Sequence, residues 1–155
     1  MGVSGTTHEG PARLSGLTTR LLALAATHSD RVVNEALAGA DARKWHYAVL
    51  ATLDEFGPAS QAQLSDRTRI YRSDIVAVVN ELAERGQVER APNPDDRRQN
   101  VITITTAGRR QLGKLDKLLK TAQDEVLAPL AQEERDQLAH LLRKLARHDD
   151  GRPAT

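Results

Sequence analysis

Apolar residues recur at intervals of three and four at both ends of the chain, the spacing that places side chains on one face of a helix. A long first helix is predicted from Pro11, which is well tolerated in a first helical turn, to Gly39. Its apolar stripe is Leu14, Leu17, Leu21, Leu24, His28 and Val32. Another helix is expected after Thr105 or Thr106 and is interrupted near Pro129. The inward positions of this helix and of the last one are Leu112, Leu115, Leu118 or Leu119, Ala122, Val126, Leu138, Leu141, Leu142 and Leu145.

The middle of the chain has shorter helical segments with clear boundaries. A second helix is predicted after the candidate cap Asp41 and ends at Gly57-Pro58. Its expected inward residues are Trp45, Val49, Leu50, Leu53 and Phe56. Ser60-Gln61-Ala62-Gln63 then has the form of a capping box, in which the serine and the second glutamine satisfy each other's backbone donors.

The helix opened by this box runs to about Thr68 and is followed by a turn at residues 69–72. The next helix ends at Gly86, a favourable residue just beyond a helix C-terminus. Its predicted buried residues are Ile75, Val78, Val79 and Leu82. A short helix, a tight turn and a longer helix indicate a helix-turn-helix.

Residues 90–108 predict a basic β-hairpin. A turn-forming run, residues 92–95, leads into Asp96, Arg97 and Arg98. The segment after it alternates, with Ile102 and Ile104 on one face and Thr103 and Thr105 on the other. Alternation beside a Pro/Asn/Asp cluster is a hairpin signal. Directly after a helix-turn-helix, such a ribbon is a wing, placed at residues 90–104, whose paired guanidinium groups are narrow enough to enter a DNA minor groove.

These elements predict a mostly α fold with a minor β component, as one domain over residues 12–147 between flexible tails at 1–11 and 148–155. The chain has 155 residues, enough for a real core. No apolar run approaches the ~18 residues of a membrane span, and the first residues lack the features of a secretory signal. We therefore expect a cytoplasmic protein, found at the nucleoid when bound to DNA, without a membrane partner.

Catalytic, metal and cofactor sites find no support in the sequence. The chain has no cysteine, which excludes disulfides and thiolate chemistry. Its five histidines lack the spacing of metal ligands, and a phosphate-binding glycine-rich loop is missing. We predict no enzyme activity and no cofactor.

The net charge of +1 argues weakly against binding to nucleic acid, but the distribution of charge matters more than its sum. Arginines cluster at residues 67–72, at 90–98 and at 109–110, whereas acids are denser in the tail helices and around Glu81 and Glu84. A basic face on a nearly neutral body favours a site-specific binder over a protein that coats phosphate indiscriminately.

Three segments resemble the MarR family of bacterial transcription regulators. FGPASQAQL, residues 56–64, resembles the family's entry into its helix-turn-helix. IYRSDIVAVVNELAERGQVER, residues 70–90, is similar to its recognition helix and first wing strand. NPDDRRQNVITITTAG, residues 93–108, matches its D-x-R wing signature. Together they make the resemblance span most of residues 12–147.

The resemblance implies a homodimer built by the helices of residues 12–40 and 106–147, with residues 41–105 as the winged lobe. It also implies double-stranded DNA with an inverted-repeat operator as partner, and commonly repression that a small effector releases. The chain departs from the family in places. Thiol-based sensing is excluded, and His46 stands where many members carry glutamine. Val76 and Ala77 are apolar where polar base-reading residues often lie.

The predicted DNA contacts lie on the recognition helix, its flanks and the wing. They are Ser60, Gln61, Arg69, Tyr71, Arg72, Ser73, Asp74, Val76, Ala77, Asn80, Arg97 and Arg98. Arg72 could reach guanine or phosphate, and Asn80 could pair with adenine or a phosphate oxygen. In the wing we favour Arg97 as the minor-groove probe and Arg98 as the partner of Asp96 that holds the loop, with the reverse assignment open.

The effector pocket is the weaker prediction. A carboxylate ligand would need an arginine and an aromatic wall. The candidates are Arg13, Arg20, His28, Arg31, Trp45, His46 and Tyr47. The alternative for Trp45 and Tyr47 is packing in the core or an interface. His28, if buried near His46, could make the dimer sensitive to pH.

A second reading of the whole chain is a helical dimer that binds ligands or proteins without a role at DNA.

Overall fold

The computed structural model describes residues 10–147, so most of the predicted tails at 1–11 and 148–155 lies outside the described residues. The elements, in chain order, are α1 (Ala12–Ser15), α2 (Thr18–Ala38), α3 (Lys44–Phe56), β1 (Ala59–Ser60), α4 (Gln61–Thr68), α5 (Arg72–Glu84), β2 (Val88–Pro92), β3 (Asn100–Ile104), α6 (Thr106–Val126) and α7 (Gln132–Arg147). This order confirms the predicted mostly helical, winged helix-turn-helix fold. None of the described helices is long and apolar enough to cross a membrane.

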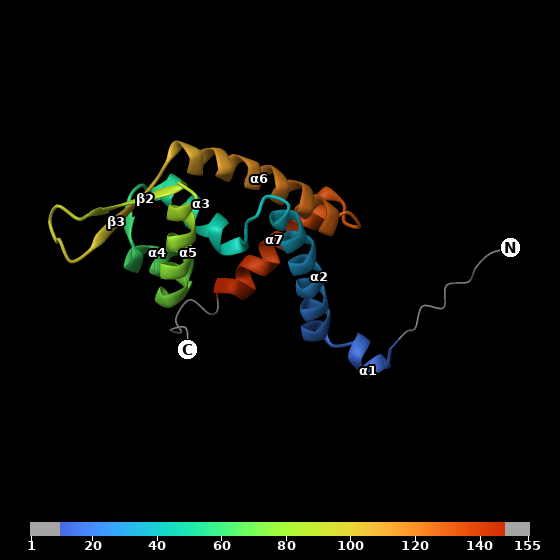
Figure 1. The fold of residues 1–155 in the computed structure, drawn as a ribbon. Coiled ribbons are helices and arrows are strands. Elements are labelled where there is room, and N and C mark those ends of the chain that lie inside the picture. Colours follow the sequence, from blue (N-terminus) through green and yellow to red (C-terminus); the bar gives the residue numbers. More distant parts are fainter. Residues whose placement is uncertain (1–9, 148–155) are drawn as a thin grey trace.

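The chain forms a lobe and an arm (Figure 1). The lobe holds α3, α4, α5 and the strands, and the arm holds α1, α2 and α7. Helix α6 runs from one to the other and packs against both α2 and α3. The recognition helix and the wing thus lie on one side of a rigid connecting helix.

A single apolar core holds the lobe together. Its fully buried aliphatic members come from α2, α3, α4, α5, β3 and α6: Leu37, Val49, Leu50, Leu53, Leu64, Ile75, Val78, Val79, Leu82, Ile102 and Leu115. The predicted buried side of α5 is confirmed, because all four of its expected residues are buried. Each fully buried aliphatic side chain contributes on the order of 1.5–3 kcal/mol.

The sheet has three antiparallel strands in the order β1-β3-β2. Ile102 and Ile104 are buried and Thr103 is half-buried, as the alternation predicts. The very short strand β1 was not predicted. It pairs Ala59 with Ile102 and Ser60 with Val101, so the residue that caps α4 is also held by the wing.

Most of the predicted helix boundaries are confirmed. Ser60 accepts the backbone N–H of Gln63, and Thr105 accepts that of Gly108, which selects Thr105 over Thr106 as the cap of α6. Gly86 has a φ of 69°, which favours glycine after the end of α5.

Two predicted boundaries at the start of the chain are wrong. The first helix is divided, because α1 ends at Ser15 and α2 begins at Thr18. Asp41 does not cap the second helix: it has a left-handed φ of 53°, and α3 begins only at Lys44. The backbone N–H before α3, that of Arg43, is instead satisfied by a histidine side chain described below.

Two residues of α3 do not face inward as predicted. Trp45 is 41% exposed and Phe56 is 59% exposed. Both lie at the ends of α3, Trp45 in its first turn and Phe56 as its last residue. The ring of Phe56 is covered by the guanidinium of Arg67, whose Cζ lies 4.7 Å from the ring centre.

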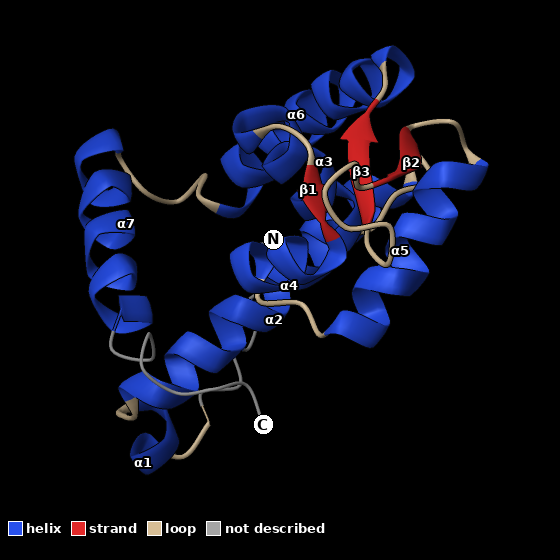
Figure 2. Ribbon diagram, turned by 90° about the vertical axis from the view of Figure 1, so that its left-hand side faces the viewer, coloured by secondary structure: helices blue, strands red, loops and turns tan. Residues whose placement is uncertain are grey.

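The leucines of the arm are uncovered in a single chain. Leu17, Leu21 and Leu24 of the first stripe are about half exposed, and only Val32 of that stripe is buried. None of the residues of α7 is buried, and this helix stands away from the lobe (Figure 2). Large apolar patches of this kind mark sites of association.

Gly108 offers a test of the packing between α6 and the wing. A Cβ at Gly108 would lie 2.1 Å from the carbonyl oxygen of Gln87, a backbone atom that cannot move aside cheaply. We expect Gly108→Ala to lower the free energy of unfolding by about 1–3 kcal/mol in urea denaturation.

Gly113→Ala is the matched control in the same helix, because its Cβ would meet nothing within 4 Å. It should stabilise the fold by about 0.5–1 kcal/mol. Equal effects of the two substitutions would contradict the close approach at Gly108.

Candidate nucleic-acid interface

A reciprocal pair of hydrogen bonds fixes the start of α4. The Ser60 hydroxyl accepts from the Gln63 backbone at 3.2 Å, and the Gln63 side chain accepts from the Ser60 backbone at 3.0 Å. Gln61 follows as the first residue of the helix and is half-buried. Backbone N–H groups at such a helix start are suited to binding a phosphate.

The turn between α4 and α5 is held by side chains of α4. Arg69 ends α4 with a left-handed φ of 59°. The hydroxyl of Ser65 donates to the carbonyl of Ile70 at 2.5 Å, and the hydroxyl of Thr68 accepts the Ile70 N–H at 3.3 Å. Because Ile70 is buried, the neighbouring Tyr71 is left exposed at the entry to α5.

The exposed side of α5 carries the predicted base-reading residues. Arg72 and Ser73 in the first turn are exposed, and Asp74 is half-buried. Val76 and Ala77 are exposed one turn later, opposite the buried side of the helix. The predicted exposure of Val76 and Ala77 is confirmed.

Asn80 has a partner that the sequence did not reveal. Its side-chain oxygen accepts a hydrogen bond from the guanidinium of Arg90 at the start of the wing. The residue predicted to read adenine thus also links α5 to β2, and hydrophobic periodicity gives no signal for such a pair.

The tip of the wing is an ordered turn. The side chain of Asn93 accepts from the backbone of Asp95 at 3.0 Å, and that of Asp96 accepts from the backbone of Arg98 at 3.1 Å. The Asn93 N–H donates to the carbonyl of Gln99 at 2.8 Å, which closes the loop. Asp96 therefore holds the backbone of Arg98, whereas an ion pair with its guanidinium was expected.

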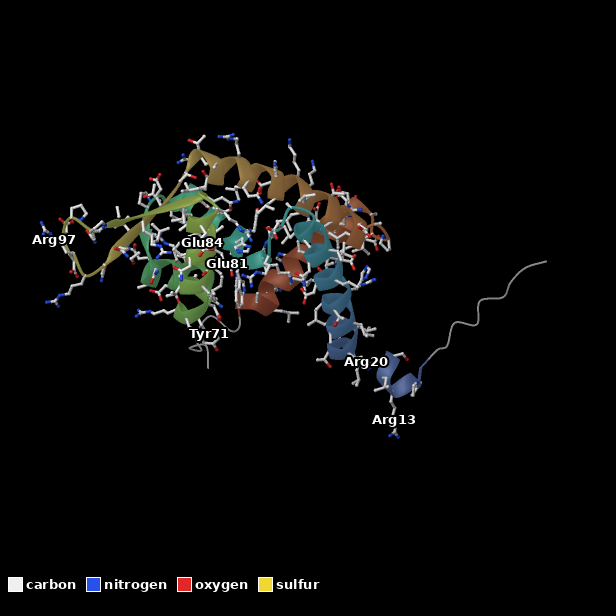
Figure 3. The ribbon with its side chains drawn as sticks, in the orientation of Figure 1. Arg13, Arg20, Tyr71, Glu81, Glu84 and Arg97 are labelled. Atoms are coloured by element: carbon white, nitrogen blue, oxygen red, sulfur yellow. The ribbon has the colours of Figure 1, made fainter. Side chains whose placement is uncertain are left out.

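The two wing arginines lie in different surroundings. Arg97 projects from the far end of the loop, away from the lobe (Figure 3). Arg98 turns back and lines a cleft of about 270 Å³ between the wing and the helix-turn-helix. The cleft is lined by Ser60, Gln61, Ala62, Arg72, Arg98, Gln99 and Asn100. It brings together four predicted DNA contacts from three separate segments, and adds Gln99 and Asn100.

The two ends of α5 carry different charges, with Arg72 at the start and two glutamates near the end. Glu81 and Glu84 lie toward the end of the helix that is remote from Tyr71 (Figure 3). Within residues 10–147, the side chains of Arg72, Arg97 and Arg98 form no ion pair. Three guanidinium groups without an ion pair in this part of the chain thus lie at the wing and the start of α5, beside the carboxylates of Asp74, Asp95 and Asp96.

The predicted effector residues are spread over the arm and the start of α3. His46 is only 2% exposed and is part of the core, and it accepts the Arg43 N–H at 2.9 Å. His28 is exposed and bonded to Arg31 at 3.2 Å, so the expected buried neighbourhood of His28 and His46 is wrong. Arg13 and Arg20 are exposed near the far end of the arm (Figure 3).

The two aromatic candidates have different surroundings. Tyr47 packs against the core, and its hydroxyl donates to Asp116 of α6 at 2.7 Å. This hydrogen bond, together with partial burial, raises the pKa of Tyr47. Trp45 is exposed beside Lys44, which pairs with Asp30 of α2. Packing, the alternative weighed for these aromatics, describes Tyr47 well.

A larger cleft of about 460 Å³ lies elsewhere, between α6 and the linker of residues 39–43 that joins α2 to α3. It is lined by Gly39, Ala40, Gln111, Lys114, Lys117, Leu118 and Thr121. None of these residues was predicted to line a ligand site, since their proximity depends on the packing of α6. Nowhere in the described part of the chain do three acidic or histidine side chains gather as a metal site.

Comparison with known proteins agrees with this geometry. A family model described as "MarR family" matches residues 41–99. A putative transcriptional regulatory protein for the hcr operon of Thauera aromatica is 32% identical over 108 residues, 70% of this chain and 65% of that protein. The chain thus spans just under two thirds of this relative's length.

Solved structures share the fold over nearly the whole chain. A probable transcriptional regulator from Pseudomonas aeruginosa is 30% identical, with a TM-score of 0.78 over 86% of this chain and 99% of that one. A mutant MarR from E. coli complexed with operator DNA is 25% identical, with a TM-score of 0.73 over 82% of this chain and 91% of that one. In both cases the shared fold covers more than four fifths of this chain.

Proposed function

Because this chain belongs to the MarR family, we propose that it is a DNA-binding transcriptional regulator that represses from an inverted-repeat operator as a homodimer. The observation that carries the proposal is the cleft at which Arg98 of the wing meets Arg72 of α5 and the start of α4. Two basic elements open onto one surface there, which is the arrangement that a duplex requires of a winged helix.

Each element of this surface has a proposed role. The N-terminal half of α5 enters the major groove, where Arg72 reaches guanine or phosphate and Val76 and Ala77 contact thymine methyl groups. Ser60 and Gln61 bind phosphate at the start of α4. Arg97, at the tip of the wing, enters the minor groove, where narrow A·T-rich tracts concentrate negative potential.

The wing assignment can be tested with an operator selected by the wild-type protein from random duplexes. Arg97→Ala with Arg98→Ala should fold normally and bind this operator about ten-fold or more weakly, because two cations leave the interface. The slope of log affinity against log salt between about 50 and 200 mM should fall by about 2. Mobility-shift or anisotropy titrations measure both quantities.

Arg110→Ala is the control, since this exposed arginine lies on α6, outside the cleft. It should leave the affinity nearly unchanged. Unchanged affinity in the wing variant would remove the wing from the mechanism. Failure of the wild type to select any duplex would favour the alternative of a helical module without a role at DNA.

We propose that the exposed leucines of the arm are the dimer interface. They lie on α2 and α7 and stay exposed in the single chain, although another side of α2 packs against α6. Covering them with the same helices of a second copy would remove the leucines from water. A two-fold axis between the arms would then present two lobes to the two halves of a symmetric operator.

Leu21→Asp with Leu24→Asp tests this interface. Carboxylates at two half-exposed positions of the stripe should convert a dimer into a monomer in sedimentation velocity at micromolar concentration. Thr19→Asp is the control, because it lies on the opposite side of α2 at 100° per residue. A wild type that sediments as a monomer would contradict the proposal.

For the effector we propose the cleft beside the linker rather than the residues first suggested by the sequence. Its volume of about 460 Å³ is within the range of small-molecule pockets. Lys114 and Lys117 lie on its rim, and neither forms an ion pair within the described residues, so both are available to a carboxylate. Leu118 offers an apolar contact to the body of the ligand. This chemistry fits a small aromatic acid.

A ligand in this cleft would also contact the linker of residues 39–43, which connects the arm to the lobe. The side chain of Gln111 donates to the carbonyl of Ala40 in the linker at 3.1 Å, and both residues line the cleft. A bound acid that breaks this bond would alter the angle between α2 and the lobe. Allosteric couplings of about 1–3 kcal/mol change affinity roughly 5–150-fold.

Benzoate and phenol are suitable probes, because they differ in the carboxylate. Benzoate should weaken operator binding of the wild type more than phenol does, and Lys114→Ala with Lys117→Ala should abolish that difference. Lys120→Ala, on the same helix but outside the cleft, should respond as the wild type does. An equal response in all three proteins would exclude the cleft as the site.

A further inference from the structure

His46 is the one buried polar side chain in the described part of the chain, and both of its ring nitrogens are used. Nδ1 accepts the backbone N–H of Arg43 at 2.9 Å. Nε2 lies 2.6 Å from the carboxylate of Glu81 on α5. Since an amide N–H can only donate, Nδ1 must be unprotonated and Nε2 must carry the hydrogen. The contacts therefore select a neutral imidazole of one tautomer.

Glu81 joins this histidine to the linker between arm and lobe. Its carboxylate also receives the guanidinium of Arg43, at 2.7 and 2.6 Å from the two oxygens. One turn further along α5, Arg85 donates to the carbonyl of Asp41 at 2.6 Å. We call Arg43, His46 and Glu81 the linker clasp. It ties the recognition helix to the residues that lead from the dimerisation arm into the lobe.

We propose that His46 is the positioning residue of this clasp, and that its protonation releases the linker and weakens operator binding in acid. The inference rests on the proposed function, because only a dimer that binds DNA through two lobes has an affinity that depends on the angle between arm and lobe. In this inference His46 holds the angle between arm and lobe and does not bind an effector.

Protonation would act at a defined atom. A proton on Nδ1 would face the Arg43 N–H, so that two donors would oppose each other across 2.9 Å. The bond that caps α3 would be lost, while Glu81 would hold the imidazolium more strongly. The linker would then be tied to α5 only by side chains, those of Arg43 on Glu81 and of Arg85 on the Asp41 carbonyl, and the backbone at the start of α3 would be less restrained. The histidine would stay attached to the recognition helix and detach from the arm.

The charged groups around His46 set the direction of its titration. Burial lowers the pKa of His46, the bond to Glu81 opposes this effect, and Arg85 and Arg43 lower it further. Asp116 of α6 is taken by Tyr47, and Arg109 by Asp54. Because the folded-state pKa is below its usual value, the neutral clasp is present above about pH 6.5 and is lost as the pH falls through the lowered value.

The test compares the affinity for the selected operator at about pH 7.5 and about pH 5.5. The affinity of the wild type for the operator should be about five-fold or more lower at the acidic pH. Exposed histidines that gain a proton add positive charge and raise affinity for DNA, so a loss has the opposite sign to their effect. His46→Gln should bind the operator with nearly the same affinity at both pH values, because glutamine does not titrate. His140→Gln, on the exposed side of α7, should behave as the wild type does.

Glu81→Gln provides a second variant that keeps an acceptor for Nε2 and removes the charge. Without the carboxylate, the proton binds His46 less readily, so the fall in affinity should move to lower pH. ¹⁵N-NMR of the His46 imidazole should show an unprotonated Nδ1 at about pH 6.5, the usual pKa of a histidine. An acid response that is the same in wild type and His46→Gln, or a protonated Nδ1 at neutral pH, would overturn the inference. Absence of binding at pH 7.5 would instead refute the proposed function.

Discussion

The packing of α5 on the lobe determines where the chemistry of this protein lies. Ile75, Val78, Val79 and Leu82 occupy one side of the helix and are almost completely buried. A helix that buries one side at this spacing must turn the opposite side to solvent, which leaves Arg72, Val76 and Ala77 facing outward. The direction of every proposed base contact is thus decided by apolar residues that never reach the DNA.

The same core positions the wing relative to that helix. Ile102 and Ile104 enter the core from β3, and the two residues of β1 join this strand to the start of α4. Ser60 consequently belongs to the sheet and to the helix cap together. Arg98 and Arg72 meet at one cleft because their segments share these supports, although 25 residues of sequence separate them. The relative position of these two arginines therefore depends on the packing of the apolar core beneath them.

Local signals were sufficient to predict most of the fold. The capping box at Ser60, the glycine after α5 and the alternation in β3 act within a few residues, so the sequence shows them directly. Contacts between distant segments could not be predicted in this way. A histidine on an apolar helix was assigned to a ligand site, because nothing near His46 in the sequence indicates Glu81, which follows 35 residues later. The exposure of Trp45 and the cleft beside α6 likewise depend on how whole helices pack.

A nearly neutral chain can carry such a surface because its charges are separated in space. Three unpaired arginines lie at the wing and the start of α5, while the carboxylate of Glu81 is near the other end of that helix and is occupied by Arg43 and His46. These bonds lower the pKa of Glu81, the Arg43 contact most of all, and keep it ionised. The carboxylate of Glu81, which would repel phosphate, is thereby directed toward Arg43 of the linker. In the proposed complex, α5 presents Arg72 to the duplex at its start and holds the linker through Glu81 near its end. A change in the linker would therefore act on the same helix that contacts the bases.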